Sequence, residues 1–115
     1  DIVKKYKEEN WLGIIAACVH PESYEIITKE LKNLDIPYGF KLNAFKNIPD
    51  DYGVRSTSTW GKGGNPTKIF GTRADINESK FYEFVKKFKN DGATILGGCC
   101  EIRPSHISKI ANLKN

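Results

Sequence analysis

The chain has 115 residues, 39% of them hydrophobic and 28% charged, which suffices for one domain with a single modest core. Its net charge of +4 comes from lysines scattered among acidic residues. No dense basic run with interleaved aromatic residues occurs, so we expect no binding to nucleic acid. No apolar run approaches the roughly 20 residues that span a bilayer, so we expect no membrane segment.

The three cysteines bear on the compartment in which the protein works. An odd number argues against a secreted disulfide framework, and the sequence carries no signal-peptide pattern. We therefore expect a reducing, cytoplasmic location, where cysteines serve as thiols, metal ligands or catalytic groups. The chain begins with Asp1 rather than methionine, so we expect that residue 1 is not the natural start of translation.

Strand and helix patterns alternate along the first part of the chain. Residues 1–10 have apolar side chains at helical spacing and predict the end of a helix. Residues 12–19 form a short apolar run, typical of a buried strand in a parallel sheet. Pro21 suits the first turn of a helix that runs to about Asn33, and residues 36–44 predict a second strand.

The next stretch, residues 45–75, predicts a long irregular segment rich in proline and glycine. A connection this long inside a compact domain is usually functional. Its glycine cluster lacks the G-x-x-x-x-G-K-[ST] spacing of a phosphate-binding loop. Beyond it, Asn77 is a good N-cap for an amphipathic helix ending near Gly92, residues 94–100 predict a third strand, and Pro104 begins a last helix.

This alternation predicts βαβ units and a parallel sheet. Three such units fit either an open sheet or part of a closed barrel, and periodicity alone does not choose between the two.

The cysteines stand where predicted strands end. Cys18 closes the first strand, and Cys99 and Cys100 close the third. Because carboxyl ends of parallel strands share one edge, we expect the three to converge. Gly97-Gly98 supplies freedom for the bend that lets adjacent cysteines reach one ion, and also lets another group approach the backbone. Three thiolates leave a corner of tetrahedral zinc open, where a substrate thiol would lose its proton.

Other interpretations of these residues stay open. The cysteines also fit small buried hydrophobic residues, and Cys99 and Cys100 a strained vicinal disulfide. His20 is either a fourth zinc ligand or a residue at a helix entry, and we interpret His106 as structural.

The cysteine motifs resemble those of a known family. The run Gly97-Gly98-Cys99-Cys100, followed by Pro104-Ser105-His106-Ile107, resembles the C-terminal signature of the homocysteine S-methyltransferase family. Cys18 with Pro21-Glu22 is similar to that family's single-cysteine motif. The resemblance covers nearly the whole chain, in the right order.

The resemblance implies a fold and a reaction. Residues 1–115 would be the last three βα units of a (β/α)8 TIM barrel. Since such barrels need about 250 residues, the N-terminal portion of the barrel would be absent from these 115 residues. Cys18, Cys99 and Cys100 would hold zinc. Homocysteine would bind through its sulfur and accept a methyl group from a small onium or carrier donor, giving methionine. The implied partners are homocysteine, the methyl donor and the N-terminal remainder of the barrel, and a homo-oligomer stays open.

Weaker cues concern substrate binding. Thr72-Arg73-x-Asp75-Ile76 is similar to a stretch in betaine–homocysteine methyltransferases, and relatives often carry asparagine at the position of Asn43. We expect Asn43, Trp60 and Arg73 to bind substrate. Trp60 would offer a cation–π face to an onium donor, with packing beneath the loop as the alternative.

The sequence also departs from the family pattern. Ala17 stands where the family usually has asparagine, and Glu101 stands where it commonly has glycine. A carboxylate there either favours a cationic partner or points to solvent. Competing functions are a non-catalytic zinc-binding module, which a fourth protein ligand would favour, and a barrel fragment that assists a partner chain.

Overall fold

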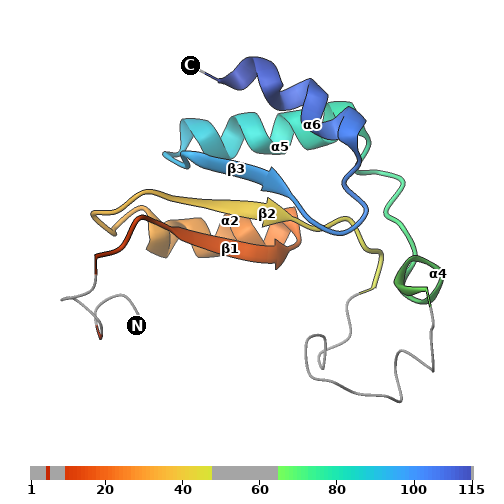
Figure 1. Ribbon diagram of the computed structural model, residues 1–115, viewed down its shortest axis with the longest axis horizontal. Coiled ribbons are helices and arrows are strands. Elements are labelled where there is room, and N and C mark those ends of the chain that lie inside the picture. Colours follow the sequence, from red (N-terminus) through yellow and green to blue (C-terminus); the bar gives the residue numbers. More distant parts are fainter. Residues whose placement is uncertain (1–4, 6–9, 48–64, 115) are drawn as a thin grey trace.

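A computed structural model describes residue 5, residues 10–47 and residues 65–114. Its elements, labelled in Figure 1, are β1 (Ile14–Val19), α2 (Pro21–Leu31), β2 (Tyr38–Leu42), α4 (Pro66–Phe70), α5 (Glu78–Asn90), β3 (Ile95–Gly98), α6 (Pro104–Ile110) and the 3-10 turn η1 (Ala111–Leu113). The helix end expected in residues 1–10 falls almost wholly outside the described residues. None of the described helices is long and apolar enough to cross a membrane.

The three strands form one parallel sheet in the order β1-β2-β3, which confirms the predicted alternation of strands and helices. Ala17 pairs with Lys41, which in turn pairs with Gly97. All three strands therefore end at the same edge, toward the side on which α4 lies (Figure 1). The cysteines follow the strands at this edge.

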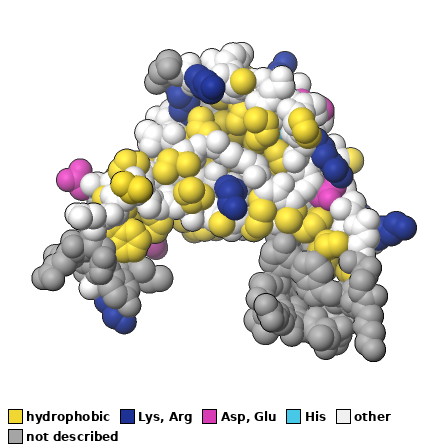
Figure 2. Space-filling model, viewed as in Figure 1, with side chains coloured by type: hydrophobic (Ala, Val, Ile, Leu, Met, Phe, Trp, Pro, Cys, Tyr) yellow, Lys and Arg dark blue, Asp and Glu magenta, His cyan; other side chains and the backbone are white. Residues whose placement is uncertain are grey.

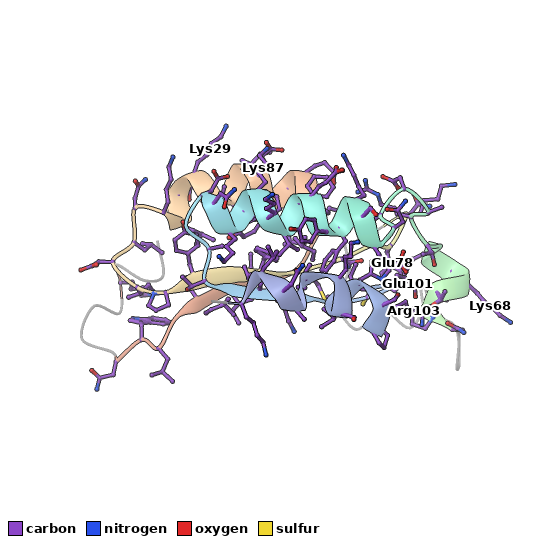
Figure 3. All side chains as sticks on the ribbon, turned by 90° about the horizontal axis from the view of Figure 1, so that it is seen from above. Lys29, Lys68, Glu78, Lys87, Glu101 and Arg103 are labelled. Atoms are coloured by element: carbon purple, nitrogen blue, oxygen red, sulfur yellow. A yellow bond between two sulfur atoms is a disulfide. The ribbon has the colours of Figure 1, made fainter. Side chains whose placement is uncertain are left out.

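The two long helices cover one face of the sheet (Figure 3). Between them and the strands lies an aromatic core in which Tyr24, Phe40 and Phe88 are fully buried. The Tyr24 ring lies 4.8 Å from that of Phe40 and 4.7 Å from that of Phe88, centroid to centroid, in edge-to-face contacts. Such contacts add specific geometry to the burial of apolar surface. This core fixes the position of β2 beneath α2 and α5.

The ends of α5 follow from local chemistry. The side chain of Asn77 accepts a hydrogen bond of 2.9 Å from the backbone N–H of Lys80, as the sequence predicts for an N-cap. After the helix, Gly92 has φ 117°, and a Cβ there would lie 2.5 Å from the Tyr38 hydroxyl oxygen. A glycine is needed at this turn for both reasons.

The other face of the sheet carries no helix within the described residues (Figure 3). Ile15 is 43% exposed there, and Ala17 and Lys41 are exposed as well. Figure 2 shows hydrophobic side chains gathered on this face. In the described part of the chain, the outer edges of β1 and β3 pair with no further strand. The structure is thus a small α/β unit that is compatible with a portion of a barrel.

The segment 45–75 is only partly irregular. We expected no regular element in it, and this was wrong for α4. Asn65 caps that helix by accepting a 3.0 Å hydrogen bond from the backbone N–H of Thr67, and Pro66 occupies the first turn. An isolated antiparallel bridge joins Phe45 to Thr72. Residues 48–64, which include Trp60, lie outside the described residues.

We predict that residues 1–115 expressed alone are poorly folded, because the bare face and the two unpaired strand edges expose apolar surface and backbone groups. Hydrogen exchange of the isolated chain should reveal few strongly protected amides. Global protection in a monomer, with a cooperative thermal transition, would contradict this prediction and favour a self-sufficient open-sheet domain.

Candidate metal centre

Cys18 lies at a bulge that ends the regular pairing of β1. The register with β2 shifts between Ala17 and Val19, and Cys18 itself has φ 51°, in the left-handed region. Bulges re-aim a side chain by interrupting the alternation of a strand. The irregularity therefore falls on the one cysteine of this strand.

Cys99 and Cys100 are held by β2 beyond the end of β3. The N–H of Cys99 donates to the Leu42 carbonyl at 2.7 Å, and the carbonyl of Cys100 accepts from the N–H of Ala44 at 2.9 Å. The ladder between β2 and β3 thus continues through both cysteines, which fixes their backbone against the middle strand.

The bend after the cysteines differs from the expected one. Neither Gly97 nor Gly98 has a positive φ, whereas Glu101 has φ 64°. The predicted close approach to the glycines is confirmed, because a Cβ on Gly98 would lie 2.3 Å from Cγ2 of Ile102. Gly98 therefore provides space, and the turn itself is made at Glu101.

The three cysteines come together as the sequence predicts. Their Sγ atoms all lie within 4.8 Å of one another, and those of Cys99 and Cys100 are 3.9 Å apart. Tetrahedral zinc with Zn–S bonds of about 2.3 Å separates its sulfur ligands by roughly 3.8 Å. The donor set fits zinc in number and chemistry, and the separation of the Cys99 and Cys100 sulfurs matches that spacing.

The structure joins Cys18 and Cys99 by a disulfide, which we did not expect. The pair that bonds is not the vicinal pair, since the parallel register brings the Cα atoms of Cys18 and Cys99 to 5.5 Å. A metal ion binds thiolates, so this disulfide and a three-cysteine metal site are alternative states of the same sulfurs.

The two histidines have structural partners. Nε2 of His20 donates to the Phe45 carbonyl at 2.7 Å, and His20 is the N-cap residue of α2. The described residues therefore place it at a helix entry and outside the cysteine cluster. Buried His106 accepts at Nδ1 from the Arg103 N–H at 3.1 Å, and its Nε2 donates to the Ile76 carbonyl at 2.9 Å. The structural interpretation of His106 is confirmed.

Asn43 lies at the end of the middle strand, between the strands that carry the cysteines. It is fully buried, and its Oδ1 accepts from the Phe45 N–H at 2.7 Å. Its Nδ2 has no hydrogen-bond partner among the described residues. A buried unsatisfied donor is costly, by about 1–3 kcal/mol. The amide is therefore suited to an acceptor that arrives with a ligand.

Arg73 connects the segment after α4 to the start of α2. Its guanidinium donates to both carboxylate oxygens of Glu22, at 2.8 and 2.7 Å, and also to Asp75, at 2.7 and 3.2 Å. Hydrogen bonds from Arg73 are the main cause that lowers the pKa of Glu22 and that of Asp75. Both carboxylates therefore keep their charge to a lower pH than an ordinary carboxylate does.

Glu101 does not point to solvent, so that alternative was wrong. Its side chain is only 5% exposed, and its carboxylate accepts from the hydroxyls of Thr67 and Thr72 and from the guanidinium of Arg103. These contacts, with the Thr67 bond first, lower the pKa of Glu101. Sequence reasoning missed the two threonines, and the unusual residue at position 101 was the only signal of this network.

Comparison with known proteins identifies the family. The model of the family described as homocysteine S-methyltransferase matches residues 1–113. The chain belongs to the homocysteine S-methyltransferase family. This membership confirms the resemblance based on the GGCC run, and it favours a methyltransferase function for the protein that contains the three-cysteine cluster.

Another similarity is more limited. The mevalonate kinase of Saccharomyces cerevisiae is 31% identical over 81 residues, covering 64% of this chain and 18% of the kinase. The chain thus spans less than a fifth of that curated relative. No solved structure matches the chain.

We predict that the main role of Arg73 is to stabilise the fold through its contacts with Glu22 and Asp75. Replacing Glu22 with glutamine in the complete protein should lower the free energy of unfolding at pH 7 by about 0.5–1 kcal/mol, since the pair is partly exposed. The pKa of Glu22 is lowered in the folded state, so its contribution is present above the unfolded value of about 4.3 and is lost as pH falls through the folded pKa. When the pH is lowered from 7 to below about 4, the free energy of unfolding should therefore fall less in the variant than in wild type.

Denaturant unfolding at pH 7 and at acidic pH measures both effects. Arg73→Lys separates this role from substrate binding, because lysine keeps the charge and loses the bidentate contact. A higher KM for homocysteine in that variant, with unchanged stability, would instead assign Arg73 to direct substrate contact.

Proposed function

We propose that the complete protein transfers a methyl group from a small onium or carrier donor to the thiol of homocysteine, at a zinc site formed by Cys18, Cys99 and Cys100. The observation that carries this proposal is the convergence of three sulfurs within 4.8 Å in a chain of the homocysteine S-methyltransferase family. A non-catalytic zinc module is the competing function.

The ligand count favours catalysis. Structural zinc sites normally use four protein ligands, whereas the described residues offer three cysteines in one cluster, with His20 engaged elsewhere. When bound, zinc supplies the acidity that converts a coordinated thiol to a thiolate near neutral pH. Thiolate ligands need reduced sulfurs, so the proposed site requires a reducing location, and the cytoplasmic location stays a prediction.

The reaction requires little proton chemistry from the protein. The thiol proton leaves to solvent, the sulfur electron pair forms the new S–CH3 bond, and the bond between the methyl carbon and the donor breaks. Its electron pair returns to the donor's leaving atom, which loses its positive charge where the donor is an onium. The role of this chain is then to hold the reactants in line, which lowers the entropic part of the barrier.

The proposed substrate contacts rest on the burial and hydrogen bonding of each expected residue. Asn43 is the best supported of the expected residues, because its buried Nδ2 lacks a partner among the described residues and would donate to an oxygen of homocysteine. Arg73 stays a prediction, with its guanidinium already bonded to two carboxylates. Trp60 stays a prediction outside the described residues.

We also propose that residues 1–115 are the C-terminal portion of a (β/α)8 barrel, completed by an N-terminal portion. Within the described residues, the bare sheet face and the unpaired outer edges of β1 and β3 support this arrangement. A further surface for the missing portion is an open, largely apolar cavity of about 590 Å³ beside β3, whose lining includes Leu96, Ile107 and Ile110.

We predict one zinc ion per chain in the reduced complete protein, bound mainly through sulfur. Replacing Cys18, Cys99 or Cys100 with alanine should remove most of the metal, because each supplies one thiolate. Elemental analysis with X-ray absorption measures both the amount and the ligands. His20→Ala is the control, and loss of zinc in that variant would favour the four-ligand, non-catalytic site.

We predict that the zinc-loaded complete protein forms methionine from homocysteine with at least one of betaine, S-methylmethionine and dimethylsulfoniopropionate as donor. Homocysteine should add one sulfur to the metal's ligands, because its thiol would occupy the position that the protein leaves open. Mass spectrometry of the product and X-ray absorption with homocysteine test the two parts. An unchanged ligand shell, together with no product, would refute the substrate assignment.

A further inference from the structure

The carboxylate of Glu101 joins two parts of the chain at the cysteine edge. Its Oε1 accepts from the hydroxyl of Thr67 in α4, and its Oε2 accepts from the hydroxyl of Thr72 at 2.8 Å. Arg103 adds an ion pair of 2.9 Å to Oε2. Figure 3 shows Glu101 and Arg103 together at the end of the sheet, beside α4. Since Glu101 follows Cys100 directly, these contacts link α4 to the turn that carries the cysteines.

The backbone conformation of Glu101 indicates that contacts of its side chain hold this residue in place. Its φ of 64° lies in the left-handed region, which disfavours residues with a Cβ and favours glycine. A residue persists in such a conformation where surrounding contacts hold it there. At Glu101 those contacts are the three donors around a side chain that is only 5% exposed.

The same contacts argue against a direct role in binding a cation. Both carboxylate oxygens already accept hydrogen bonds, and the guanidinium of Arg103 offsets the negative charge. A cationic methyl donor would have to displace these groups before it reached the carboxylate. The side chain therefore acts on the segment that it holds.

That segment is otherwise attached to the continuation of β2 and, through Arg73 directly after it, to Glu22 of α2. The Lys46 N–H donates to the Gly71 carbonyl at 2.8 Å, and the Asn47 N–H donates to the Phe70 carbonyl at 3.0 Å. Glu101 supplies a further attachment, to the β3 side of the cysteine edge. Together these attachments set the position of residues 65–72 relative to the sulfurs.

We propose that Glu101 is a positioning residue for the methyl donor. By holding residues 65–72 beside the three-cysteine cluster, it sets the position in which the donor binds. This inference rests on the proposed function. The donor must approach the homocysteine sulfur in line from the carboxyl edge of the sheet, where this segment lies. A displacement of about 1 Å at such a point can cost on the order of a hundredfold in rate. Homocysteine binding, by contrast, depends on the cysteines and on Asn43.

The test compares variants of the zinc-loaded complete protein, with S-methylmethionine and betaine as the donor probes. Glu101→Gln removes the charge, and Glu101→Gly removes the carboxylate while relieving the backbone. Thr67→Val removes one donor without touching Glu101. All three should raise the donor KM or lower kcat/KM for the donor by about tenfold or more. Zinc content and the Kd for homocysteine should stay within about twofold of wild type, because the cysteines are unchanged.

Glu83→Gln is the matched control, since Glu83 is an exposed carboxylate that pairs with Lys80 on α5, and it should behave as wild type. Unchanged donor kinetics in Glu101→Gln, or wild-type kinetics in Glu101→Gly, would overturn the inference alone. So would a loss of zinc or of homocysteine binding in these variants, which would make Glu101 a support of the metal site. A wild-type protein that forms no methionine would overturn the proposed function and this inference together.

Discussion

The pairing of β2 with its two neighbours is the constraint on which the cysteine cluster depends. The Val19 carbonyl accepts from the Asn43 N–H at 2.8 Å, and the Cys99 N–H donates to the Leu42 carbonyl at 2.7 Å. The middle strand therefore fixes both cysteine-bearing strand ends through backbone hydrogen bonds. A slip of one residue in either pairing would turn side chains to the opposite face and separate the sulfurs.

The aromatic core keeps that register in place. Phe40 is fully buried against Tyr24 and Phe88, so its strand presents one defined face to the helices. Lys41, its neighbour, is consequently left on the bare face. Burial on one side thus determines which side chains remain available on the other side and at the carboxyl edge. The packing of the helices therefore also determines the geometry of the cysteine cluster.

The sequence predicted what local patterns determine. The parallel sheet of alternating strands and helices, the Asn77 cap and the convergence of the cysteines follow from periodicity, capping chemistry and the shared edge of parallel strands. The Cys18–Cys99 disulfide and the buried carboxylate of Glu101 did not follow, because each depends on residues distant in the chain. The Glu101 carboxylate meets Thr67, 34 residues earlier, and no periodic pattern encodes such a contact.

The short helix α4 is a second feature that local sequence patterns did not predict. Asn65-Pro66 is a standard helix start, yet proline and glycine nearby favoured an irregular segment. Five residues carry too little periodicity to outweigh those signals, and the helix is recognisable only through its cap.

The segment around α4 is bound to both cysteine-bearing loops, by an ion pair on one side and by hydrogen bonds to a carboxylate on the other. Arg73 reaches Glu22, in the helix that follows Cys18, and Glu101, next to Cys100, reaches Thr67 and Thr72. A segment attached on both sides cannot shift toward one loop without loosening its contact with the other. The two loops in turn hold the sulfurs through the β2 ladder. A ligand that moved one cysteine loop would also strain these contacts to residues 65–75, so we expect the cysteine cluster and the segment beside it to respond together.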